Sequence, residues 1–188
     1  PYRRQRQMCI ETGAYSGEKL EPETYTSYDL ALDNRDALAG DIYKNAEGYY
    51  RSVFENAGGS ISFYPDKSGA VPTAELYRRE SAEISVQGVK EFCKKHGITE
   101  NVFFISAFGI TLGKYNFKKD AVFTTVYHGR NDSRLSETVG MLVKTLPVYC
   151  NFAGSTEQCL TEVQKQLINS MNNDIYPFSQ ISHEFNIK

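Results

Sequence analysis

The chain has 188 residues, of which 40% are hydrophobic and 13% aromatic, and this composition predicts one globular domain with a substantial core. Its formal net charge of −2 gives no electrostatic reason to expect a nucleic acid or a membrane surface as a partner. No signal peptide and no apolar run of bilayer-spanning length is recognised, which predicts a cytoplasmic location. The four cysteines form no Cys-x-x-Cys pair, so no metal site is expected.

The first part of the chain predicts helix more clearly than strand. Residues 1–24 are polar and show no clear pattern. Residues 25–58 combine helix formers with apolar side chains at helical spacing and end on two glycines, which predicts a helix with Tyr43, Ala46, Tyr50 and Phe54 on its apolar side. Residues 60–64 predict a short strand, and the charged residues 75–85 predict an edge strand.

Two helices with clear start signals follow. Ser85 is suited to cap the first, which Gly97 closes and whose apolar stripe is Val86, Val89, Phe92 and Cys93. Thr99 is suited to cap the second. The second helix is apolar on almost every side, so we expect it to be buried, with Phe104, Ala107, Phe108, Leu112 and Tyr115 at helical spacing.

The rest of the chain alternates strand and helix signals. Residues 120–129 predict a central strand, and residues 141–152 predict a second strand in which Pro147 causes an interruption or marks an edge. Ser155 and Gln158 have the form of a capping box before an amphipathic helix, and a last helix is expected from about Ser179. Pairs of helices between separated strands predict a layered α/β or α+β fold.

The sequence offers few candidates for catalysis. It has three histidines, of which His128 alone stands at a predicted strand end, where catalytic groups often lie; the others are His96 and His183. It contains no Gly-x-Ser-x-Gly nucleophile elbow, no glycine-rich phosphate loop and no paired metal-binding carboxylates. An active site made from these residues alone is therefore not expected.

The segment Gly129-Arg130-Asn131-Asp132 allows two interpretations. Gly, Asn and Asp form turns by themselves, so a plain turn explains the segment. In the other interpretation, Arg130 anchors an acid or a phosphate across a cleft between domains. On these residues alone, the turn is favoured.

Five segments, in order, resemble the condensation domains of nonribosomal peptide synthetases. DAVFTTVYHGRND resembles the strand and turn of that family that end in Gly-Arg-Asn, here Gly129, Arg130 and Asn131. VGMLVKTLPV resembles I-G-x-F-V-N-T-L and matches it at Gly140, Val143, Thr145 and Leu146. NDIYPF resembles H-Q-D-Y-P-F and matches it at Tyr176, Pro177 and Phe178. Upstream, YTSYDLA resembles a Y-x-D-Y-A motif, and EGYYRSVF resembles the helix that follows it.

The resemblance implies a fold and a reaction. The fold is a chloramphenicol acetyltransferase-like lobe of sheet and helices, and residues 1–188 are expected to be an incomplete condensation domain, mostly its C-terminal lobe, without the N-terminal lobe and the closing strands. The reaction is amide-bond formation between thioesters borne by carrier proteins. The implied partners are carrier-protein domains and adjacent synthetase domains. The substrates arrive on phosphopantetheine arms, and no directly bound cofactor is implied.

The catalytic motif of that family, H-H-x-x-x-D-G, does not occur in these 188 residues. No catalytic residue is therefore expected in this chain, and the chain alone is expected to be inactive. The candidates for lining the substrate tunnel or bridging the lobes are His128, Gly129, Arg130, Asn131, Gly140, Lys144, Thr145, Asn173, Tyr176 and Pro177. Exposed apolar surface where the missing parts belong is expected to favour self-association.

The sequence departs from the motifs at two positions. Lys144 replaces the Asn of the second motif, and Asn173 replaces the His of the third. Strand alternation places Lys144 on the face of Leu142 and Leu146, where a lysine must reach solvent, a carboxylate or the tunnel. One hypothesis is that Lys144 lines the tunnel and favours acidic substrates; the alternative is a solvated lysine on an edge strand.

Two other functions stay open at this point. An epimerization domain is a close relative and inverts a carrier-bound aminoacyl centre, although VGMLVKTL resembles the condensation form of the motif more closely. A degenerate module that only docks a partner protein is the other alternative, and the two departures from the motifs support it.

Overall fold

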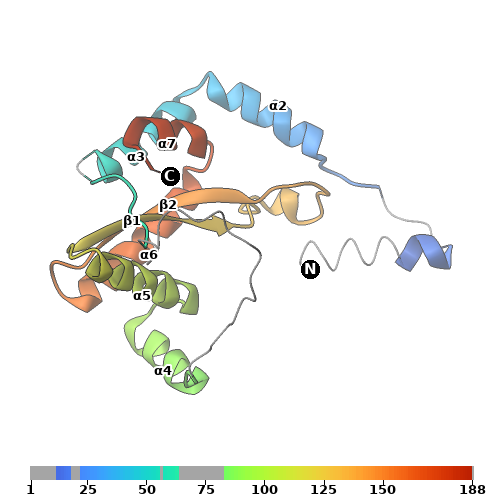
Figure 1. Ribbon diagram of the computed structural model, residues 1–188. Coiled ribbons are helices and arrows are strands. Elements are labelled where there is room, and N and C mark those ends of the chain that lie inside the picture. Colours follow the sequence, from blue (N-terminus) through green and yellow to red (C-terminus); the bar gives the residue numbers. More distant parts are fainter. Residues whose placement is uncertain (1–11, 18–21, 56, 64–82, 188) are drawn as a thin grey trace, which may run out of the picture.

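The computed structural model describes residues 12–17, 22–55, 57–63 and 83–187. In this part of the chain, an antiparallel pair of strands lies between two groups of helices (Figure 1). The strands are β1 (Asp120–Tyr127) and β2 (Lys144–Asn151). The helices are α2 (Ser27–Leu38), α3 (Asp41–Phe54), α4 (Val86–His96), α5 (Glu100–Tyr115), α6 (Thr156–Asn172) and α7 (Phe178–Phe185), with a 3₁₀ turn η1 (Ser133–Ser136) between the strands. The layered mixture of helix and sheet confirms the predicted fold class.

The helix starts follow the capping residues of the sequence. The side chains of Ser85, Thr99 and Ser155 each accept a backbone N–H from the first turn of their helix. Ser155 and Gln158 form the predicted capping box at the start of α6. Gly97 ends α4 in the left-handed conformation that glycine adopts most easily. These local signals work because they satisfy backbone groups that a helix end leaves unpaired.

The strands differ from the prediction in extent and place. β2 begins at Lys144 rather than residue 141, and it passes through Pro147 without interruption, with Pro147 opposite Thr124. In the described residues β1 pairs with β2 alone, so the expectation of a central strand is wrong for this part of the chain. β2 is likewise an edge there, which is where a strand tolerates a proline.

Two other expectations need correction, and a third lies mostly outside the described residues. The single helix expected between residues 25 and 58 is two helices, because Gly40 caps a new helix, and the second ends at Phe54, four residues before the predicted glycine stop. The described residues 60–63 of the short strand form no strand, although the backbone N–H of Ile61 donates to the carbonyl of Val122 at 3.1 Å. The edge strand at 75–85 lies mostly outside the described residues, and residues 83–85 are not in a strand.

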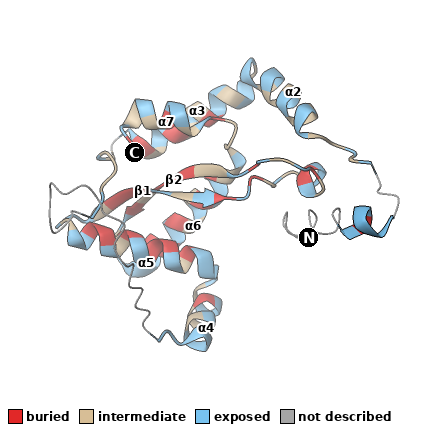
Figure 2. Cartoon of the chain, turned by 45° about the vertical axis from the view of Figure 1, so that its right-hand side comes forward, coloured by how far each residue is buried: buried red, intermediate tan, exposed pale blue. Residues whose placement is uncertain are grey.

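The strand pair separates two cores (Figure 2). One face of the sheet packs against α5 and α6, around Phe123, Val148 and Cys150. The other face packs against α3 and α7, around Val122, Tyr50 and Ile181. The alternation of Val122 and Phe123 between the cores follows from the two-residue period of a strand. Cys93 and Cys159 are small buried side chains, 4% and 1% exposed.

Helix α5 is buried on one side only, so the expectation that it is buried all round is wrong. Of its predicted apolar positions, Leu112 is 2% exposed, whereas Phe104, Phe108 and Tyr115 are 46–47% exposed. The helix turns its small residues Ser106, Gly109 and Gly113 to the sheet. Small residues shorten the distance between helix and strands, and the large rings then lie on the outer side. Among the described helices, none is long and apolar enough to cross a membrane.

Two glycines allow the tight approach of chain segments. Gly129 follows β1 with a φ of +67°, and a Cβ atom there would overlap the backbone carbonyl of Leu142. Gly109 lies on α5, and a Cβ atom there would come within 2.7 Å of the Cβ of Cys150 on β2. The glycines therefore set how closely the loop after β1 and helix α5 approach their neighbours.

We expect Gly129→Ala to lower the free energy of unfolding by about 2–5 kcal/mol. Alanine would have to adopt the left-handed backbone conformation of Gly129, and its Cβ atom would overlap the carbonyl of Leu142. Chemical denaturation followed by circular dichroism measures the change. Gly58→Ala is the matched control, since no atom lies within 4 Å of its Cβ position. A loss of stability equal to that of the control would contradict this account of the turn.

Replacing two helical glycines by alanine is expected to change the stability of the protein in opposite directions. Gly109→Ala should destabilise by about 1–3 kcal/mol, because the new methyl group has no room beside Cys150. Gly48→Ala, in α3 with open space around its Cβ position, should stabilise by about 0.5–1 kcal/mol through helix propensity. Thermal unfolding of both variants checks the contrast, and two changes of the same sign would refute it.

Candidate functional site

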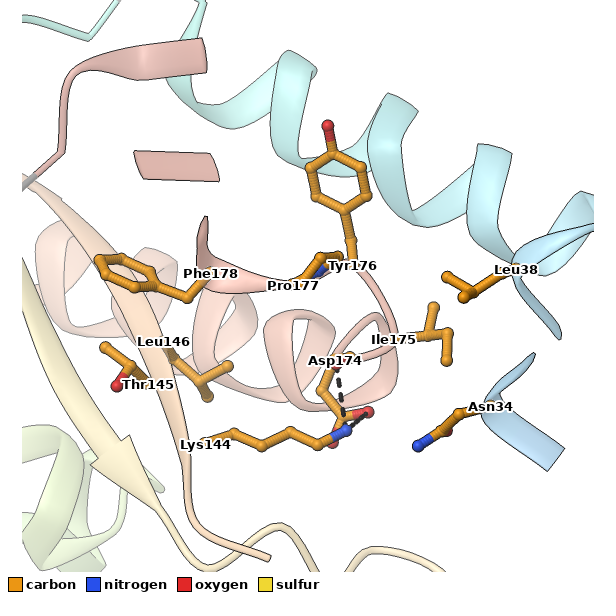
Figure 3. A pocket seen from close by; sticks show the side chains of 10 residues that line it. All are labelled: Asn34, Leu38, Lys144, Thr145, Leu146, Asp174, Ile175, Tyr176, Pro177 and Phe178. Carbon is orange, nitrogen blue, oxygen red and sulfur yellow. Dashed lines mark hydrogen bonds and ion pairs between the residues drawn. The ribbon is translucent and has the colours of Figure 1, made fainter. Parts of the chain in front are cut away.

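A cavity of about 430 Å³ lies where the start of β2 meets the loop between α6 and α7 (Figure 3). Helix α2 closes one side with Asn34 and Leu38. The first three residues of β2, the loop before α7 and the first residue of α7 supply the rest of the wall: Lys144, Thr145, Leu146, Asp174, Ile175, Tyr176, Pro177 and Phe178. The cavity thus joins three segments of the chain, one of which, in α2, lies more than a hundred residues before the other two.

An ion pair crosses the wall of this cavity. The ammonium of Lys144 lies 2.9 Å from Oδ1 of Asp174 and donates to the backbone carbonyl of the same residue at 3.1 Å (Figure 3). The lysine therefore reaches a carboxylate, one of the three outcomes expected from the sequence. Both side chains are partly buried, 32% and 21% exposed, so water weakens their attraction less than at an open surface.

Tyr127 holds the other oxygen of the same carboxylate. Its hydroxyl donates a hydrogen bond to Oδ2 of Asp174. Burial and this hydrogen bond raise the pKa of Tyr127 above its ordinary value, so the hydroxyl keeps its proton at neutral pH. Tyr127 and Lys144 are also direct partners at the end of the strand ladder. One carboxylate therefore ties both strand ends to the loop that precedes α7.

Next to this cavity lies a wider groove of about 700 Å³ between α2 and the connection from β1 to β2. Gly129, Asn131 and Met141 line it, and it shares Asn34, Lys144 and Asp174 with the first cavity. On its rim, Arg134 lies 3.0 Å from Asp33 of α2 and 2.6 Å from Asp132, and it covers the ring of Tyr25 at 4.4 Å. These contacts attach α2 to the loop between the strands.

The Gly-Arg-Asn segment makes local contacts. The guanidinium of Arg130 donates to the carbonyl of Leu135 in its own loop, and the amide of Asn131 donates to the carbonyl of Met171 at 2.9 Å. Nδ1 of the exposed His128 accepts the backbone N–H of Arg130 at 3.0 Å. In this part of the chain the segment therefore acts as a turn packed on α6, and its role as a bridge between lobes stays a prediction.

The remaining predicted residues divide into two groups. Thr145, Tyr176 and Pro177 line the cavity together with Lys144. Gly140 packs instead beside Ser27, and Asn173 ends α6, where its side chain donates to the carbonyl of Asn169 at 2.8 Å. Tyr176 is buried and donates to Glu184 at 3.1 Å. Burial, with this hydrogen bond, raises the pKa of Tyr176 to about 12.

Sequence reasoning missed Asp174, Tyr127 and Asn34. Asp174 lies inside the quoted segment NDIYPF, where the motif H-Q-D-Y-P-F has Gln. An acid at that position and a lysine in place of the motif's Asn were a signal that the two charges meet. Asn34 carried no such signal, because only the packing of α2 brings it to the cavity.

The arrangement is suited to binding rather than to bond-making. The charged groups in the wall are paired, and the sides are mostly apolar. Within the described ranges, no three His, Cys, Asp or Glu side chains are grouped closely enough to hold a metal ion. The geometry offers a shaped, partly closed space in which a substrate is oriented and water is displaced.

Comparison with known proteins identifies the family. The condensation-domain family model matches residues 12–188. The chain is 29% identical over 174 residues to nonribosomal peptide synthetase sidC of Arthroderma benhamiae, covering 89% of this chain and 3% of that protein. It is 27% identical over 184 residues to surfactin synthase subunit 1 of Bacillus subtilis, covering 92% of this chain and 5% of that protein. The chain thus spans a small part of these relatives.

Solved structures agree on the fold. The condensation domain from Monacolin K polyketide synthase MokA superposes with a TM-score of 0.72 at 14% identity, covering 100% of this chain and 46% of that one. The first condensation domain of the calcium-dependent antibiotic synthetase, in complex with a substrate analogue, gives a TM-score of 0.69 at 14% identity, covering 92% and 39%. With the family model matched over nearly its whole length, this chain belongs to the condensation-domain family.

Proposed function

We propose that this chain forms part of a condensation domain that makes an amide bond between two thioesters borne by carrier proteins. The amine nitrogen of the acceptor attacks the thioester carbonyl of the donor, and the thiol of the donor's phosphopantetheine arm leaves. The family match supports the proposal, as do relatives that are peptide synthetases. Carrier-protein domains and neighbouring synthetase domains are the partners that this reaction requires.

The observation that carries the proposal is the meeting of two motif segments at one cavity. Thr145, from the segment that resembles I-G-x-F-V-N-T-L, lines the same space as Tyr176 and Pro177, from the segment that resembles H-Q-D-Y-P-F. A cavity of this kind aligns a tethered substrate and removes water that would hydrolyse its thioester. The role proposed for this chain is therefore to orient the substrate, and the histidine pair is proposed to come from the rest of such a domain.

The reaction is tested with a complete condensation domain that contains this chain, incubated with loaded donor and acceptor carrier proteins. We expect the mass of the acceptor-bound species to increase by the donor acyl group, and the 188-residue chain alone to give no product. Inverted stereochemistry of a carrier-bound aminoacyl group without amide product would indicate epimerization. Carrier binding with neither product would indicate a docking module. Either result would overturn the proposal.

The role of the cavity is tested by filling it. Thr145→Trp places a large ring in the space beside Tyr176 and should lower kcat/KM for amide formation by about tenfold or more, because it displaces the substrate from its attack position. Ile168→Trp is the control, since Ile168 is 53% exposed on α6 and does not line the cavity. Equal rates for the two variants would show that the cavity takes no part in the reaction.

A further inference from the structure

The cavity beside β2 carries charges that cancel. Of the described residues that line it, Lys144 and Asp174 are the charged ones, and they pair at 2.9 Å. The largest part of the remaining wall is apolar, formed by Leu38, Leu146, Ile175, Pro177 and Phe178. A ligand in this space therefore meets no net charge, although a full positive and a full negative charge stand in the wall.

Each charge of the pair already has a partner within the protein. Both donors that reach the carboxylate of Asp174, the ammonium of Lys144 and the hydroxyl of Tyr127, come from the strand ends and approach different oxygens. The ammonium also donates to the backbone carbonyl of Asp174. A charged ligand would give up its own hydration in a mostly apolar space and would face two charges that already offset each other, so its desolvation would cost free energy.

An uncharged polar group also lines this space. The amide of Asn34 reaches the cavity from α2, beside the ion pair (Figure 3). In the described part of the chain this amide has no hydrogen-bond partner, so it can donate to or accept from a neutral ligand at no loss of an existing contact. The wall thus combines apolar area, one free amide and a closed ion pair.

We propose that the Lys144–Asp174 pair makes this cavity select substrates whose side chain or acyl group is uncharged. The inference rests on the proposed function, because it takes the occupant of the cavity to be the aminoacyl part of a carrier-borne substrate. It differs from the hypothesis that Lys144 favours acidic substrates, since Asp174 already neutralises the ammonium. Selection comes from the pairing, so removing either partner should create a preference for one sign of charge.

The two single variants are expected to act in opposite directions. Asp174→Asn keeps an oxygen for Tyr127 and leaves Lys144 with an uncompensated charge, so the cavity should gain affinity for an anionic side chain. Lys144→Met keeps the length of the side chain and leaves Asp174 charged, so the cavity should gain affinity for a cationic one. The double variant Lys144→Met/Asp174→Asn has no charge in the wall and should again prefer an uncharged ligand.

Binding of small probes to the 188-residue chain tests the charge preference expected of each variant. The probes are leucyl, glutamyl and lysyl derivatives of N-acetylethylenediamine, in which a stable amide replaces the thioester and the α-ammonium is the same in all three. Isothermal titration should show the leucyl probe binding most tightly to the unmodified chain. Relative to the leucyl probe, the affinity of the glutamyl probe should increase about tenfold in Asp174→Asn. The relative affinity of the lysyl probe should increase about tenfold in Lys144→Met.

Controls separate charge in the cavity from charge elsewhere and from folding. Lys165→Met and Glu157→Gln remove one charge of each sign from exposed positions on α6 and should leave the probe ranking unchanged. Circular dichroism confirms that each variant is folded. The double variant guards against a structural explanation, because it loses the ion pair yet is expected to regain the ranking of the unmodified chain.

Three results would overturn the inference: an unmodified chain that prefers the glutamyl or lysyl probe, single variants whose ranking does not change, or no binding of any probe. None of them decides whether the complete domain forms an amide bond, which the carrier-protein assay measures separately. If the carrier-protein assay gives no amide product while the ranking of probe affinities changes as expected in the variants, the proposed charge selection is supported and the proposed reaction is refuted.

Discussion

The carboxylate of Asp174 is the contact on which the candidate site depends. It receives Tyr127 from the end of β1 and Lys144 from the start of β2, two residues that already face each other in the strand ladder. The loop that continues from Asp174 forms one wall of the cavity before it enters α7. The hydrogen bond from the Lys144 ammonium to the backbone carbonyl of Asp174 adds a second polar contact between the same wall and the strand ends.

The two-sided sheet makes this attachment possible. Its faces pack on α5 and α6 on one side and on α3 and α7 on the other, so the strand pair is held between apolar layers and its ends are left at the boundary. Polar side chains there can reach one another without being fully buried. Close approach at Gly109 and Gly129 keeps the layers and the connecting loop near the sheet. The packing therefore positions the polar contacts of the site.

Local signals predicted much of the secondary structure. Capping by Ser85, Thr99 and Ser155, the stop at Gly97 and the two strands follow from interactions between near neighbours in the chain, and all are present. The prediction was wrong where distant contacts decide. The exposure of Phe104 and Phe108 depends on which face of α5 fits the sheet, and small residues rather than large ones made that choice. For Pro147, one of the two predicted alternatives is present, because β2 is an edge strand in the described part of the chain.

By itself, the sequence determined the family resemblance, the layered fold class and the expectation that Lys144 needs a partner. Motifs, periodicity and the cost of burying a charge can all be recognised from the order of the residues alone. The tertiary structure alone decided that the partner is Asp174, that Tyr127 shares the same carboxylate, and that Asn34 faces them from α2. Thirty residues separate Lys144 from Asp174, and more than a hundred separate Lys144 from Asn34. The spacing of residues along the chain does not predict such contacts, since they form only when helices and strands bury their apolar faces together.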